Sequence, residues 1–270
     1  MRVATIDIGT NSVLLLVAER RGGAVVPVLE RATITRLGRG VDRTRAFDPA
    51  AVEATLACLG EYAQEIARAG AARVDVVGTS AMRDARGGED FRERAAALLG
   101  VPPRVISGHE EAELTFAGAP SGLEIEGPAL VFDLCGGSTE LIRGVVHKGE
   151  ATLASALSVD VGSVRFTERF LASDPPLAEE IAEARRATRA LLDAALITLG
   201  APEPAAQLVG VAGTVTTLAA FALGVAPYDP LRVHGARLGA EVVARAAASS
   251  RRSPSQSAAR SQRSSPSAPT

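Results

Sequence analysis

The chain has 270 residues, a formal net charge of −2 and 47% hydrophobic residues, enough for one large domain or two lobes of about 120 to 130 residues each. This charge balance argues against a general nucleic-acid surface, and the sequence contains no apolar run long enough to cross a membrane. Cys58 and Cys135 lie far apart without CxxC spacing, which argues against a disulfide framework or a zinc site and predicts a reduced, cytoplasmic protein.

The first predicted element is a hairpin over residues 3–17, and its turn has the sequence DIGTNS at residues 7–12. Apolar runs on both sides predict strand, tight turn and strand. Small residues let the backbone N–H groups of such a turn point inward and hold an anion. An acid at the strand end can also hold a magnesium ion through water. We therefore predict a phosphate-binding turn made of Asp7, Gly9, Thr10, Asn11 and Ser12, with Asp7 also serving the metal.

Strands and helices alternate along the rest of the first half. A third strand is expected at residues 25–29. Asp48 and Pro49 then predict a helix start, and helical spacing of apolar residues continues to Gly70. Further segments predict a strand at 73–77, a helix at about 88–99 and a strand at 104–106. This alternation indicates an α/β sheet.

The sequence GTSAMR at residues 78–83 places small residues directly after a predicted strand, with Arg83 close behind. A guanidinium donates two parallel hydrogen bonds to a phosphate group, so Arg83 is a candidate phosphate ligand. The alternative is an ordinary surface arginine.

The sequence SGHEEA at residues 107–112 is the second informative stretch. Ser107 and Glu110 form a capping-box pattern that starts a helix at about 108–117, so Glu110 has a structural duty. Glu111 has none, and a carboxylate at this position between two lobes can orient and deprotonate an attacking water. The alternative is a solvated surface glutamate.

The sequence DLCGGS at residues 133–138 repeats the first turn in the same register, with Asp133 in the place of Asp7 and Ser138 in the place of Ser12. A strand is expected before it at 129–133 and another after it, around 151–158. Because the turn occurs twice, we predict two turns that face each other and clamp a phosphorylated substrate. The second turn contributes Gly136, Gly137 and Ser138.

Two helices are expected next, at about 160–171 and 177–199. The sequence GVAGT at residues 210–214 then joins a short strand to a helix at about 214–223. Exposed N–H groups and the helix dipole favour an anion at Gly213 and Thr214. The alternative is a plain strand–helix connection.

The composition changes at Ser249. The segment 249–270 is rich in serine, contains four arginines and no acid, and has no aliphatic residue larger than alanine. It cannot bury enough apolar surface to offset the entropy of ordering, which predicts a disordered tail.

These stretches, taken in order, resemble the Ppx/GppA family of exopolyphosphatases and guanosine pentaphosphate phosphohydrolases, within the actin-like sugar kinase/Hsp70 superfamily. The matching motifs lie at residues 7–12, 78–83, 107–112, 133–140 and 210–214. The resemblance implies two actin-like lobes with the substrate between them. We expect lobe I over residues 1–125 and lobe II over 126–248.

Residue by residue, the resemblance assigns the catalytic carboxylate to Glu111 and the metal-linked acid to Asp133, with Asp7 as the matching acid of the first turn. Arg83 falls on the phosphate-facing arginine. The implied reaction is attack of water on a terminal phosphoryl group of polyphosphate, guanosine pentaphosphate or both, with Mg²⁺ as cofactor. Relatives in the family often pair, so a homodimer is implied, with no nucleic-acid or membrane partner.

Two departures from the family pattern keep other functions open. Cys135 replaces a glycine of the second turn, which would strain the backbone if that position requires positive φ. The family's final strand–helix unit is also missing, so we expect an incomplete second lobe. A non-catalytic member that binds phosphorylated nucleotide or polyphosphate is the main alternative. A kinase of the same superfamily is disfavoured because the Glu111 motif belongs to the hydrolases.

Overall fold

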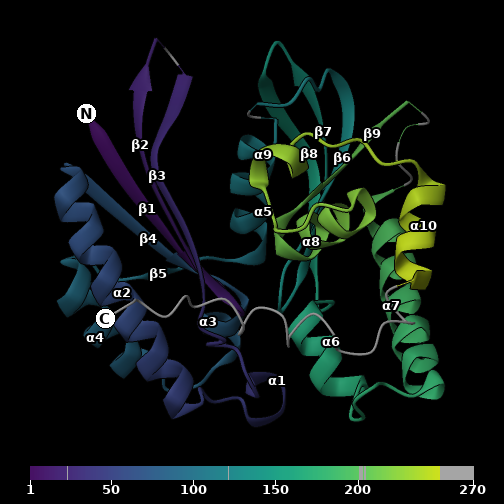
Figure 1. Ribbon diagram of the computed structural model, residues 1–270, viewed down its shortest axis with the longest axis horizontal. Helices are drawn as coiled ribbons and strands as arrows, with labels where there is room; N and C mark the ends of the chain where they lie inside the picture. The colour runs from purple at the N-terminus through teal and green to yellow at the C-terminus, as the bar shows by residue number, and fades with distance from the viewer. Residues whose placement is uncertain (23, 121, 201–202, 204, 250–270) are drawn as a thin grey trace, which may run out of the picture.

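The computed structural model describes residues 1–22, 24–120, 122–200, 203 and 205–249. Two lobes stand side by side, each built on a mixed β-sheet with helices packed against it (Figure 1). The α/β prediction is confirmed. The predicted disordered tail lies outside the described residues, apart from Ser249, which ends the last helix.

The first sheet has the strand order β3-β2-β1-β4-β5. Strand β1 pairs antiparallel with β2 and parallel with β4. Strand β3 runs well past the predicted residues 25–29, because its backbone pairs with β2 over most of its length even where its side chains are polar. The strands are β1 (Arg2–Ile8), β2 (Ser12–Arg21), β3 (Ala24–Ile34), β4 (Arg73–Gly78) and β5 (Arg104–Val105).

The second sheet repeats this pairing with the order β8-β7-β6-β9. Strand β6 pairs antiparallel with β7 and parallel with β9, as β1 does with β2 and β4. Within the described residues, no strand stands beyond β9 in the place that β5 takes in the first sheet. The strands are β6 (Gly127–Leu134), β7 (Thr139–His147), β8 (Glu150–Val159) and β9 (Gln207–Val211).

Helix α2 (Pro49–Ala69) covers one face of the first sheet, and α4 (Glu89–Leu99) packs beside it. The start of α2 is capped as predicted, because the Asp48 side chain accepts a hydrogen bond from the N–H of Ala51. It ends at Gly70, whose φ of 66° is left-handed. Leu59 and Tyr62 join Ile6 in the first core.

Two helices cover opposite faces of the second sheet. Helix α5 (Gly108–Gly118) packs on one face, where Phe116 meets Val131. Helix α7 (Ala178–Leu199) packs on the other, where Leu199 meets Phe132. Successive strand residues alternate between these cores, as the two-residue period of a strand requires. Helix α5 thus follows the first sheet in sequence but lies against the second sheet (Figure 1), where its apolar side chains join the core.

The short helix α3 was not predicted from the sequence. It forms because the chain turns directly after β4, and the N–H groups of Met82 and Arg83 bond back to the Thr79 carbonyl. No helix among the described residues is long and apolar enough to span a membrane. The remaining helices are α1 (Val41–Thr44), α3 (Ser80–Asp84), α6 (Ser163–Phe170), α8 (Ala212–Leu223), α9 (Pro230–Val233) and α10 (Ala240–Ser249).

Candidate functional site

The two repeated turns have the same backbone geometry. In the first, the N–H of Gly9 donates to the Ser12 carbonyl at 2.9 Å; in the second, the N–H of Cys135 donates to the Ser138 carbonyl at 3.1 Å. Each turn joins the two antiparallel strands at the centre of its sheet. The repeat seen in the sequence is therefore a repeat of structure.

The turns also meet across the two lobes. A Cβ placed on Gly136 would lie 3.2 Å from the Cβ of Asn11 and 3.3 Å from that of Thr10. A Cβ on Gly137 would lie 2.5 Å from Ser80 Oγ and 2.6 Å from Thr10 Oγ1. Only glycine fits at Gly137 without a shift of its neighbours. The predicted juxtaposition of the turns is thus present in the fold.

Several turn N–H groups lack a protein acceptor. Among the described residues, this holds for the N–H groups of Thr10, Asn11, Gly136 and Gly137. The carbonyl of Gly136, in contrast, accepts a 2.9 Å hydrogen bond from the N–H of Val164, which lies at the N-terminal end of α6. The turns therefore keep donors for an anion while the carbonyl of the second turn is used elsewhere.

Glu111 lies at the start of α5 and is 8% exposed, so the alternative of a solvated surface glutamate is wrong. Its Oε2 accepts a 2.7 Å hydrogen bond from Nη1 of Arg83, which also donates to the Ile106 carbonyl. Burial raises the pKa of Glu111 more than the Arg83 hydrogen bond lowers it. Within the described chain, Nε and Nη2 of Arg83 have no hydrogen-bond acceptor. Arg83 thus binds the carboxylate through Nη1, and its Nε and Nη2 donors stay available for a phosphate group.

The adjacent Glu110 behaves differently. The Ser107 side chain accepts from the Glu110 N–H at 3.1 Å, as expected of an N-cap. The Glu110 side chain pairs with the exposed Arg104 instead of returning to the cap. Two successive glutamates are thus separated into one buried and one exposed carboxylate.

Asp7 and Asp133 lie at the ends of the paired strands, in equivalent places of the two lobes. Burial, helped by the charges of Glu111 and Asp133, raises the pKa of Asp7 to about 7. The Oδ1 atom of Asp7 is buried and has no hydrogen-bond partner among the described residues. Burial also raises the pKa of Asp133, which accepts from Thr115 Oγ1 at 3.1 Å and from Cys135 Sγ at 3.2 Å. The sequence-predicted acids of both lobes therefore share one electrostatic environment.

Sequence reasoning missed Glu140, which belongs to this group. Its side chain is fully buried, and burial followed by the charge of Glu111 raises its pKa to about 7. Ser158 Oγ donates to its Oε1 at 2.7 Å, whereas Oε2 has no hydrogen-bond partner in the described part of the chain. One sequence signal was available: Glu140 directly precedes the apolar Leu141 and Ile142 in a predicted strand. Burying a carboxylate there costs folding free energy, which indicates a functional role.

Cys135 does not strain the second turn. Among the described non-glycine residues, positive φ occurs at Arg36, Arg45, Lys148 and Ala212. Cys135 does not have positive φ, so the strain expected for a non-glycine residue at this position does not arise. Burial raises the pKa of the Cys135 thiol above its usual range, so it remains protonated and donates to Asp133.

Gly213 and Thr214 lie in the first turn of α8, which begins beside the second turn because Val211 pairs with Asp133. No side chain of the described residues caps this helix start, and Ala212 adopts a left-handed φ of 73°. The predicted position at the sheet edge is therefore observed, and the anion-binding role of Gly213 and Thr214 stays a prediction. Within the part of the chain described, no three acidic, histidine or cysteine side chains form a ready-made metal site.

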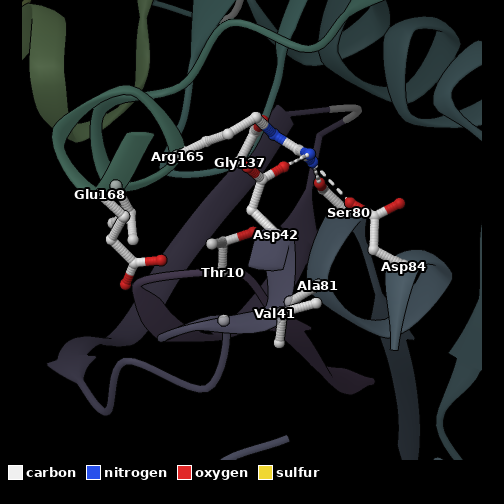
Figure 2. Close-up of a pocket in the computed structure, with 11 residues that line it drawn as sticks. Thr10, Val41, Asp42, Ser80, Ala81, Asp84, Gly137, Arg165 and Glu168 are labelled. Carbon is white, nitrogen blue, oxygen red and sulfur yellow. Dashed lines mark hydrogen bonds and ion pairs between the residues drawn. The ribbon is translucent and has the colours of Figure 1, made fainter. Parts of the chain in front are cut away.

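A second omission from the sequence reasoning is Arg165 of α6. Figure 2 shows its guanidinium entering a pocket between the lobes, beside Asp42, Ser80 and Asp84. It is 5% exposed. A basic residue on a short amphipathic helix is typical of an exposed surface, so no sequence signal marked Arg165 as buried.

Known proteins of one family are similar to this chain. The sequence profile of the Ppx/GppA phosphatase family matches residues 16–248. Exopolyphosphatase 2 of Mycobacterium tuberculosis is 42% identical over 247 residues, which cover 88% of this chain and 76% of the relative.

Solved structures give the same result for the fold. The crystal structure of an exopolyphosphatase-like protein superposes with a TM-score of 0.85 at 38% identity, covering 92% of this chain and 77% of the other. A Ppx/GppA family member from Aquifex aeolicus superposes with a TM-score of 0.76 at 34% identity, covering 97% and 82%. The predicted two-lobe, actin-like architecture is confirmed by these superpositions.

Proposed function

The chain belongs to the Ppx/GppA phosphatase family, a family of hydrolases, and we propose that it releases the terminal phosphoryl group of inorganic polyphosphate, of guanosine pentaphosphate, or of both. One observation carries the proposal: the carboxylate of Glu111 is buried, accepts a 2.7 Å hydrogen bond from Arg83 and lies near Asp7 and Asp133, the acids of the two turns. The name exopolyphosphatase 2 of the Mycobacterium tuberculosis relative supports polyphosphate as a substrate class.

Glu111 acts as the general base. Its carboxylate accepts a proton from water as the water oxygen attacks the terminal phosphorus, and the bond from that phosphorus to the bridging oxygen breaks. The products are inorganic phosphate and a chain or nucleotide shorter by one phosphate. Arg83 fixes the carboxylate through its 2.7 Å hydrogen bond. A general base works best with a pKa near the operating pH, and burial moves that of Glu111 upward.

The two turns hold the phosphoryl oxygens. Their unpaired N–H groups at Thr10, Asn11, Gly136 and Gly137 are fixed donors that need no reorganisation during the reaction. The Nε and Nη2 donors of Arg83 and the hydroxyl of Ser138 add to these N–H groups. Gly213 and Thr214, at the start of α8, lie at the same end of the second sheet as the second turn. The role of these residues is to neutralise charge that develops on the transferred group.

The residues present fit a magnesium ion. Mg²⁺ prefers oxygen ligands and is usually held by one or two carboxylates together with waters and substrate phosphates, so a complete protein cage is not required. Asp7 has a buried oxygen that no described residue contacts by a hydrogen bond, and Asp133 stands in the equivalent place of the other lobe. Asp7 and Asp133 would hold the ion, which supplies neutralisation of phosphoryl charge when bound.

The decisive assay is phosphate release by the purified chain with Mg²⁺ from long polyphosphate, short polyphosphate and guanosine pentaphosphate, with p-nitrophenyl phosphate as a monoester control. The proposal expects release from at least one phosphoanhydride and much less from the monoester. A folded sample that releases phosphate from none of the anhydrides would contradict it and favour a binding protein without turnover. The predicted homodimer and cytoplasmic location stay predictions.

A further inference from the structure

We propose that Arg165 is a positioning residue for the second phosphate turn: its buried guanidinium fastens the turn at Gly136 and Gly137 to the first lobe. This proposal rests on the function proposed above, because it assigns to Arg165 the placement of donors used in that reaction. Arg165 itself is not expected to touch the substrate, since its donor nitrogens are all occupied by protein acceptors.

The three nitrogens of Arg165 bond to both lobes. Nε donates to the Gly137 carbonyl of the second turn at 2.6 Å, and Nη1 donates to Asp42 Oδ1 of the first lobe at 2.6 Å. Nη2 donates to Asp84 Oδ2 and, at 3.3 Å, to Ser80 Oγ. Figure 2 shows the side chain crossing from α6 to these acceptors. One rigid, planar group therefore links a turn of one lobe to two carboxylates of the other.

Helix α6 and the second turn form one unit behind this link. The N–H of Ser163 donates to the Cys135 carbonyl at 3.0 Å, and the N–H groups of Val164 and Arg165 donate to the Gly136 carbonyl at 2.9 and 3.1 Å. A Cβ on Gly162 would lie 2.4 Å from the Gly136 carbonyl oxygen, so the backbones are in direct contact. Movement of α6 therefore moves the turn.

The same helix makes two further contacts with the first lobe that do not involve the turn. Both carboxylate oxygens of Glu168 accept from the Gly40 N–H at 3.0 Å. Arg169 donates to both oxygens of Asp42, at 2.7 to 3.1 Å. Arg169 thus shares the Asp42 partner with Arg165 but is 40% exposed at its side chain and has no bond to Gly137 or Ser80. It is the matched control.

The consequence for the reaction is geometric. The carbonyl of Gly137 is held by Arg165, so the orientation of the peptide that carries it, and of the donors beside it, depends on that bond. Displacement of about 1 Å in a group that positions the reacting centre can cost about 100-fold in rate. Lysine keeps the charge but cannot make the forked contacts, so Arg165→Lys is expected to fall short of the natural residue.

The test compares Arg165→Lys and Arg165→Met with Arg169→Met, using polyphosphate as substrate and temperatures at which circular dichroism shows each protein folded. For both Arg165 variants we expect kcat to fall by about 100-fold with KM changed by less than about threefold. The Arg169 control is expected to stay within about threefold of the wild type in both constants. Unchanged kcat in Arg165→Met would overturn the proposal, as would an equal loss in the control.

Hydrogen exchange gives a readout independent of activity. In Arg165→Met we expect faster exchange at the backbone N–H groups of residues 164 and 165, which donate to the Gly136 carbonyl. Exchange in the middle of α2 should be unchanged. Exchange that is unaltered at α6, or raised equally in both lobes, would contradict the positioning role. If the wild-type protein releases no phosphate, the proposed function fails, and the exchange result alone still decides whether Arg165 fastens the turn.

Discussion

Arg83 Nη1 donates a 2.7 Å hydrogen bond to Glu111 Oε2, joining a short helix of the first lobe to the start of α5. The pair is mostly buried, with 23% and 9% of the two side chains exposed. It fixes the direction of the carboxylate, and it opposes the rise in pKa that burial causes. Glu111 is thereby kept both buried and available as a base.

Replacement of Arg83 by methionine is predicted to move the acidic limb of the pH–rate profile to higher pH. The positive charge of Arg83 lowers the pKa of Glu111, so its removal raises that pKa, and the active carboxylate form then appears only at higher pH. Loss of a charge-assisted hydrogen bond is expected to reduce kcat/KM at pH 7 by about 10- to 100-fold. The measurement is kcat/KM for phosphate release between pH 5 and 9.

Arg104→Met serves as the control for that profile, because Arg104 pairs with the neighbouring but exposed Glu110. It should leave the acidic limb in place. A profile of Arg83→Met with an unmoved acidic limb would mean that Glu111 is not the group whose ionisation limits the rate.

Gly137→Ala is predicted to destabilise the protein and to abolish most turnover. Its new Cβ would lie 2.5 Å from Ser80 Oγ and 2.6 Å from Thr10 Oγ1, which forces the lobes or the turn to shift. A cost of about 1 to 3 kcal/mol in unfolding free energy is expected from such overpacking. Gly60→Ala is the contrasting change, because its Cβ would meet nothing closer than 3.9 Å. Inside helix α2 it should add up to about 1 kcal/mol. Urea unfolding of both variants checks the opposite signs.

Glu140→Gln is predicted to gain stability relative to the wild type as pH rises. The pKa of folded Glu140 is raised from 4.5 to about 7. The protonated form therefore stabilises the fold fully below about pH 4.5, and this contribution is lost as pH rises through about 7. Glutamine stays neutral throughout, so the difference in unfolding free energy should grow by roughly 1 to 3 kcal/mol between pH 5 and pH 8. Urea unfolding in EDTA measures it, and a pH-independent difference would contradict the burial argument.

Magnesium is predicted to raise the thermal midpoint of the wild-type protein by a few degrees at millimolar concentration, because an ion that binds only the folded state stabilises it. Asp133→Asn should reduce that shift. Asp75→Asn, an exposed change on β4, should leave it intact. Differential scanning calorimetry with and without Mg²⁺ separates the cases, and equal shifts in all three proteins would exclude Asp133 as a ligand.

Local sequence signals predicted the secondary-structure elements well where neighbouring residues alone determine the backbone conformation. Asp48, Pro49 and Gly70 marked the bounds of α2, because caps and a left-handed end are set by a few neighbouring residues. The repeated turn was also visible, since both copies carry the same small residues in the same register. These features depend on residues close together in the sequence.

Features that depend on the meeting of distant segments were harder to predict. Glu111 and Glu110 are adjacent in sequence, and only the packing of α5 makes one buried and the other exposed. Arg165 acquires its role from Asp42 and Asp84, which lie far away in the chain. The spacing of apolar residues gives the face of a helix but not the identity of the lobe that it meets.

The central claim is that Glu111 is the base of a phosphoanhydride hydrolase, and the most direct test is phosphate release from polyphosphate with Mg²⁺ by the wild type, Glu111→Gln and Glu110→Gln. We expect the wild type and Glu110→Gln to release phosphate at similar rates, and Glu111→Gln to lose about 100- to 10,000-fold in kcat while still binding the substrate. Glu111→Gln that turns over at the wild-type rate would contradict the claim.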